Sequence, residues 1–189
     1  MRLPRKITVA LLGLLSLPAA ALAAVIGGTY YAPQYDFREF FAATDGRNFQ
    51  VILAGNPFPG TDPALVARDL LPWMQAAKPR PALTFTYEDP PERPRPYYRL
   101  VLIFDPALDF GSNQVCAGAP PRLRQGRPGL FYVFAVYCRN DQVMSETTAW
   151  TPATAPNDPR IGALFRELFQ VVFSDSPALR PQNGGLDRR

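Results

Sequence analysis

Residues 130–151 read LFYVFAVYCRNDQVMSETTAWT, and this stretch decides the fold. Its first nine residues are almost all apolar, which predicts a β-strand that is buried on both faces and therefore central in a sheet. The polar residues at 139–142 predict a hairpin turn. Residues 143–151 are more polar, so we expect them to return as a strand near an edge of the sheet.

The flanking sequence supplies the other elements of a layered fold. Apolar or alternating residues predict three more strands, at 49–54, 83–88 and 97–104. Asp62-Pro63 and Asp158-Pro159 are helix-start pairs, and each precedes apolar residues at helical spacing. The sequence therefore predicts an α+β fold, a two-layer sandwich in which two helices pack on one face of a mixed sheet of about five strands.

The N-terminus predicts export. Residues 1–23 contain a basic start, an apolar run at 7–17 and an A-x-A site at 21–23, which are the three parts of a secretory signal peptide. We expect the mature chain to begin near Ala24 and to be periplasmic or secreted. The alternative is an uncleaved inner-membrane anchor over residues 7–26, because about twenty apolar residues span a bilayer. The domain lies outside the cytoplasm under either interpretation.

The rest of the chain divides into three parts. Residues 24–47 are rich in aromatic side chains and indicate an N-terminal arm or short helix packed on the domain. Residues 48–173 form a single α+β domain, long enough to bury a substantial core. Residues 174–189 are polar and rich in Gly and Pro, which predicts a loose C-terminal tail.

The chain has two cysteines, Cys116 and Cys138. In an oxidising compartment we expect them to form a disulfide, and two buried free thiols are the alternative. If strands 97–104 and 130–138 pair antiparallel, Cys138 lies at the end of the pair away from residue 104. Cys116 must then lie back along about eight residues of strand, roughly 26 Å. Residues 105–129 should therefore lie folded along the sheet and not act as a lid.

Charge argues against a nucleic-acid partner. The chain has 20 Lys and Arg against 16 Asp and Glu, but three of the basic residues and none of the acidic ones lie in residues 1–23. The remaining arginines are scattered, whereas nucleic acid and anionic lipid require a clustered positive field. We expect membrane contact only if the N-terminal segment stays uncleaved.

The sequence is poor in catalytic groups. It has no histidine, which removes the commonest general base and the commonest zinc ligand. Two carboxylate pairs, Glu88 with Asp89 and Asp105 with Asp109, allow glycoside hydrolysis as an alternative, and the second pair allows a calcium site. Both pairs follow predicted strands, where solvated turn carboxylates are the simpler explanation. We therefore expect no enzymatic activity, no cofactor and no metal.

Residues 55–60 read GNPFPG and form the most distinctive loop. The loop follows a buried strand and precedes a helix N-terminus, where crevices of α/β sheets bind ligands. Asn56 offers an amide and Phe58 an exposed anchor for a contact. The alternative is that Asn56 caps the strand end and Phe58 covers the core. The tyrosines at 30, 31, 97 and 98 leave the same choice between a contact surface and core packing.

The GNPFPG run, the two dispersed cysteines and the Asp158-Pro159-Arg160 helix start resemble a family of uncharacterised exported bacterial proteins. The order of strands and helices is also similar in outline to small periplasmic α/β domains of envelope lipoproteins, although no lipid-bearing cysteine follows the apolar run. Neither resemblance implies an activity or functional residues.

These observations predict a non-catalytic binding or accessory module of the bacterial envelope, which acts through contacts with another envelope protein. Two alternatives stay open. One is a carboxylate-dependent hydrolase of cell-wall sugars, and the other is a small-ligand carrier, which needs an apolar cavity of roughly several hundred Å³.

Overall fold

The structure is a computed structural model, and it describes residues 24–177. The predicted signal peptide at 1–23 and residues 178–189 of the predicted tail lie outside this range. In chain order the elements are β1 (Val25–Tyr31), α1 (Phe37–Thr44), β2 (Asn48–Ala54), α2 (Pro63–Ala76), β3 (Thr84–Thr86), β4 (Tyr98–Phe104), α3 (Ser112–Cys116), β5 (Leu130–Arg139), β6 (Gln142–Pro152) and α4 (Pro159–Val172).

The strands form one mixed sheet in the order β1-β6-β5-β4-β2-β3. β2 pairs parallel with β3 and β4, whereas β4, β5, β6 and β1 are successive antiparallel neighbours. The predicted α+β fold with a mixed sheet is therefore confirmed, and the apolar strand β5 has neighbours on both sides. The sheet has six strands and not about five, because the first strand lies in the segment that was predicted to be an arm.

Residues 24–47 are part of the domain and not an arm laid upon it. They form β1, which pairs along β6 with a bulge between Ile26 and Thr29, and then the short helix α1. The strand escaped prediction because Gly27 and Gly28 interrupt the alternation of side chains that indicates a strand. β1 pairs with the outer edge of β6, so β6 is the second strand of the sheet and not its edge strand.

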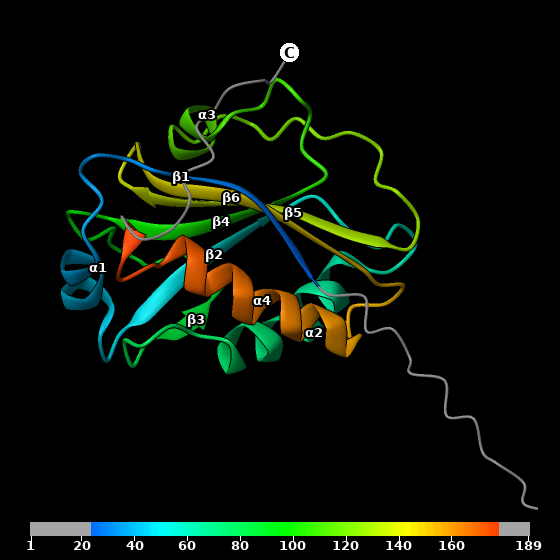
Figure 1. Cartoon of the computed structure of the whole chain (residues 1–189), viewed down its shortest axis with the longest axis horizontal. Coiled ribbons are helices and arrows are strands. Elements are labelled where there is room, and N and C mark those ends of the chain that lie inside the picture. Colours follow the sequence, from blue (N-terminus) through cyan, green and yellow to red (C-terminus); the bar gives the residue numbers. More distant parts are fainter. Residues whose placement is uncertain (1–23, 178–189) are drawn as a thin grey trace, which may run out of the picture.

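Helices α2 and α4 lie side by side on one face of the sheet (Figure 1). Asp62 and Asp158 cap them, and each carboxylate accepts a hydrogen bond from the amide two residues on, at 2.8 and 2.9 Å. Both predicted helix starts are confirmed, and α2 continues through Pro72. The helices approach closely at Gly162, where a Cβ would lie 2.5 Å from Cε3 of Trp73.

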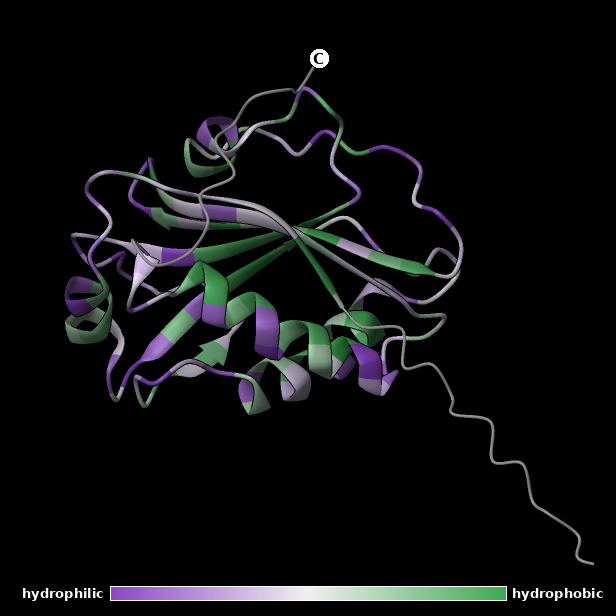
Figure 2. Cartoon of the chain, viewed as in Figure 1, coloured by the Kyte–Doolittle hydropathy of each residue, from purple (hydrophilic) through white to green (hydrophobic). Residues whose placement is uncertain are grey.

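The main core lies between these helices and the sheet, where the apolar faces of both layers meet (Figure 2). Tyr137 of β5 is almost fully buried, with ring centroids 5.4 Å from Phe40 and 5.3 Å from Phe173. Phe40 itself stacks on Phe173 at 4.5 Å. Such aromatic pairs contribute about 0.5–1.5 kcal/mol each beyond area burial, so they hold α1 firmly against the end of α4.

Residues 105–129 cover part of the opposite face of the sheet, on the side away from α2 and α4 (Figure 1). Phe110 and Val115 pack there in a second apolar cluster with side chains of β4 and β5, among them Ile103 and Phe134. The segment thus follows the folded-back path that the sequence predicted. It adds a partial layer to the two that the sequence indicated.

Candidate functional site

The disulfide predicted between Cys116 and Cys138 is present, with the two Cα atoms 5.5 Å apart. Arg99 lies opposite Cys138 in the pairing of β4 with β5. Its guanidinium donates hydrogen bonds to the backbone oxygens of Cys116 and Asn140, both at 2.6 Å. Burial lowers the pKa of Arg99, and the two carbonyls partly replace the water that the buried group has lost. Arg99 and the disulfide together fasten α3 to the β5–β6 hairpin.

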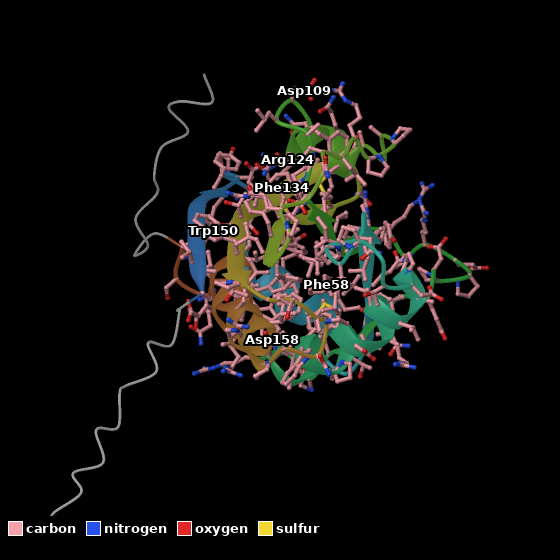
Figure 3. The ribbon with its side chains drawn as sticks, turned by 90° about the vertical axis from the view of Figure 1, so that its right-hand side faces the viewer. Phe58, Asp109, Arg124, Phe134, Trp150 and Asp158 are labelled. Carbon is pink, nitrogen blue, oxygen red and sulfur yellow. A yellow bond between two sulfur atoms is a disulfide. The ribbon has the colours of Figure 1, made fainter. Side chains whose placement is uncertain are left out.

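The GNPFPG loop closes the core at the end of β2. The amide nitrogen of Asn56 donates to the Thr61 carbonyl at 2.8 Å, and its side-chain oxygen accepts from the Phe58 amide at 3.0 Å. Phe58 is buried and stacks near Phe131 with centroids 5.9 Å apart, and Figure 3 places it inside the domain. Phe58 therefore covers the core and is not an exposed anchor. The amide of Asn56 is used inside the loop.

The structure does not bring the carboxylate pairs together as working sites. Asp105 is buried, and burial raises its pKa while the nearby Arg124 guanidinium lowers it in part. Asp109 lies exposed in an ion pair with Arg122. The two carboxylates of this pair therefore lie in different environments, one buried and one exposed and paired with an arginine.

Glu88 and Asp89 are both exposed, and Asp89 pairs with Arg93 at 3.7 Å. The Gln50 amide also donates to Asp89 at 3.3 Å, so this carboxylate fixes the chain after β3. No group of three or more His, Cys, Asp or Glu side chains suited to a metal ion occurs within residues 24–177.

Among the residues that the structure describes, the layer at 105–129 covers β4, β5 and the start of β6, where Val143 joins the second apolar cluster, and it leaves the rest of β6 and β1 without a covering layer. Strand alternation and register place Val25, Tyr30, Tyr132 and Trp150 on this uncovered side, because Val25 and Tyr132 both pair with Trp150. Tyr30 is 50% exposed and Val25 is 41% exposed. We call this surface the open face and define it by these four residues together with Glu146, the register partner of Tyr30.

The open face has an ordered row of rings. Tyr132 and Trp150 lie with centroids 6.1 Å apart and planes within 22° of parallel. The Arg124 guanidinium lies 5.3 Å from the Tyr132 centroid, and Figure 3 labels Arg124 and Trp150 in the upper part of the domain, away from Asp158 at the start of α4. A guanidinium at this distance from a ring is attracted by its π-system. The Tyr132 ring therefore has both the Trp150 ring and the Arg124 guanidinium as neighbours.

The sequence pointed to only part of this surface. The sequence left the tyrosines at 30, 31, 97 and 98 open between a contact surface and core packing; Tyr30 is exposed, whereas Tyr31, Tyr97 and Tyr98 are buried. Tyr132 and Trp150 were missed because they lie within strands that were judged by hydrophobicity alone. An aromatic residue on each of two hairpin strands, at nearly equal distance from the turn, is the signal that was available, and the bulge after Tyr137 makes up the difference of one residue.

Comparison with known proteins adds little to this geometry. No protein-family model and no curated protein match the chain. Among solved structures, the PelC dodecamer from Paraburkholderia phytofirmans is similar at a TM-score of 0.44 and 10% identity, over 80% of this chain and 99% of that one. A second crystal form of PelC gives a TM-score of 0.42 at 10% identity, over 79% and 96% of the two chains. Similarity at this level supports no functional argument.

One finding bears on the compartment. A disulfide that forms and persists is typical of proteins outside the cytoplasm. No helix within the described part of the chain has the length and apolar character needed to cross a bilayer.

Proposed function

We propose that this protein is an exported, non-catalytic binding module of the bacterial envelope, and that it contacts a partner protein through the open face. The observation that carries the proposal is the row of exposed and half-exposed rings on an uncovered sheet face. Export to the periplasm or beyond rests on the N-terminal sequence and on the disulfide.

Shape and composition favour a protein partner at this surface. Tyr and Trp are enriched in protein interfaces, where their rings supply contact area and their polar atoms remain hydrogen-bonded. The open face lies on strands β1, β6 and β5, and the outer surface of a sheet suits another folded surface better than a small molecule, which needs a concave site. Arg124 and Glu146 flank the rings with opposite charges, as at the polar rim of an interface.

Photocrosslinking in the producing cell tests the proposal. A benzoylphenylalanine replaces Tyr30, which is 50% exposed, and in a matched control it replaces Leu65 of α2, which is 42% exposed. We expect a discrete adduct of defined mass from position 30 and none from position 65. We also expect Val25→Asp to abolish that adduct, because it places a charge beside the rings.

Equal adducts from positions 30 and 65 contradict the proposal, since they indicate unspecific collisions. The absence of any adduct at position 30 together with turnover of a cell-wall glycan by the purified protein also contradicts it. In that case the protein is an enzyme and not a contact module.

A further inference from the structure

A hollow of about 360 Å³ lies between the C-terminal ends of α2 and α4, close to α1. We call it the α2–α4 hollow. It is on the helical side of the domain, separate from the open face. Its volume falls in the range of sites that hold small ligands, about 300–1,000 Å³.

Aromatic side chains form the apolar part of the hollow. Phe169 and Phe173 of α4 are buried, with ring centroids 5.9 Å apart, and Phe37 of α1 adds a half-buried ring. Facing them, α2 ends in Ala76 and Ala77, which are too small to fill the space between the helices. The sequence therefore leaves room at this point for a flat or narrow apolar group.

Positive charge surrounds this apolar floor. Lys78, Arg80 and Arg166 line the hollow, with Asp175 as the one acidic residue in its lining. Lys78 is anchored, because its Nζ lies 3.3 Å from the Leu83 carbonyl. Arg80 and Arg166 form no ion pair with any carboxylate of residues 24–177. Two guanidinium groups thus remain available to an anion.

Cations beside a helix C-terminus also complement the helix dipole, and this explains Lys78 and Arg80 in part. It does not explain Arg166, which lies near the middle of α4 and outside its last turn. Arg166 and Gln170 share one side of α4 with Phe169 and Phe173, since these positions are three or four residues apart. Charge and aromatic surface therefore converge from separate elements on one hollow.

We propose that the α2–α4 hollow binds a small amphiphilic carboxylate. The apolar body of the ligand lies against the half-buried Phe37 ring and Ala76, above the buried Phe169 and Phe173 rings, and its carboxylate pairs with the Arg80 and Arg166 guanidinium groups. Arg is suited to this role because its planar donors match the two oxygens of a carboxylate. The proposal does not depend on the open face or on a protein partner.

Titration of the mature, oxidised protein followed by NMR tests the inference. The probes are 3-phenylpropanoate, its neutral analogue 3-phenylpropanol, and acetate, which has the charge without the apolar body. We expect saturable shifts with 3-phenylpropanoate, at a Kd of about 1 mM or below, and binding at least about tenfold weaker for the other two probes. The shifted resonances should belong to α4 and to the end of α2.

Variants separate the two parts of the site. Arg80→Gln with Arg166→Gln should weaken 3-phenylpropanoate binding about tenfold or more, and Ala76→Leu should block the hollow without touching its charges. Arg68→Gln on α2 is the matched control, because Arg68 is exposed, pairs only with Asp69 and does not line the hollow. Ala76 is itself exposed, so the variant keeps its fold, which circular dichroism verifies.

Three results overturn the inference. These are no shift up to 10 mM of 3-phenylpropanoate (about 10 times the expected Kd), equal affinity for the neutral analogue, and unchanged affinity in the double arginine variant.

Discussion

Removing the disulfide should destabilise the domain by an amount that the structure sets. Cys116 and Cys138 are 22 residues apart in sequence. In the chain-entropy model, opening a loop of this length lowers the free energy of unfolding by about 3 kcal/mol at 25 °C. Both residues are buried in the second apolar cluster, so the Cys116→Ala, Cys138→Ala variant also loses sulfur packing. We expect a total loss of about 3–4 kcal/mol.

Urea unfolding of the protein, followed by circular dichroism, measures this loss. The reduced wild-type protein is the control, because it lacks the cross-link but keeps both sulfur atoms. If the cross-link acts mainly on the unfolded chain, the reduced protein should lose about 3 kcal/mol, close to the loss in the double variant. The slope with urea should rise in both, because the uncrosslinked chain exposes more surface.

Hydrogen exchange localises the same effect. Amides of α3 and its flanking loop should exchange faster in the double variant, while those of β1 and β6 stay protected, because only residues 105–129 lose their fastening. A loss of less than about 1 kcal/mol, or faster exchange spread evenly over the sheet, refutes the idea that the disulfide pins this layer.

Three further changes test other contacts. Arg99→Lys keeps the charge but cannot donate to both backbone carbonyls. Urea unfolding should therefore show a loss of about 2 kcal/mol in the free energy of unfolding. An unchanged urea midpoint contradicts the role given to the guanidinium. Gly162→Ala sets a methyl against the Trp73 ring and should lower stability by about 1–3 kcal/mol, whereas Gly111→Ala, with nothing within 4 Å, should have little effect. Burial raises the pKa of Tyr98 to about 12 from an ordinary value of 10.0. The free energy of unfolding should therefore have its full value below pH 10 and fall as the pH rises toward 12. Tyr98→Phe should show a smaller fall, and equal falls in both proteins contradict the assignment.

Local signals in the sequence predicted most of the fold because they act over short distances. Asp-Pro pairs mark the starts of α2 and α4, and the unbroken apolar run of β5 requires neighbours on both sides. The path of residues 105–129 was predictable because a disulfide and strand geometry together leave little choice. These are constraints that a few residues impose by themselves.

The parts that were missed depend on contacts between distant segments. β1 carries a weak pattern and becomes a strand only because β6 offers it a free edge, 118 residues away at the Thr29–Thr147 hydrogen bond. Arg99 interrupts an apolar strand, and its carbonyl partners come from two other segments. The open face exists because residues 105–129 cover only the start of β6, where α3 packs, and no local pattern records where a covering segment stops.

Oxidative footprinting of the open face tests the proposed function most directly. The exported protein is labelled with hydroxyl radicals both purified and in periplasmic extract, and the modification of Tyr30 and Trp150 is compared with that of Phe41 and Leu65. Phe41 and Leu65 are the reference because they are 39% and 42% exposed and lie on helices. Contact through the open face predicts that Tyr30 and Trp150 lose reactivity in the extract while Phe41 and Leu65 keep theirs. Unchanged reactivity at Tyr30, or protection at Leu65 alone, contradicts it.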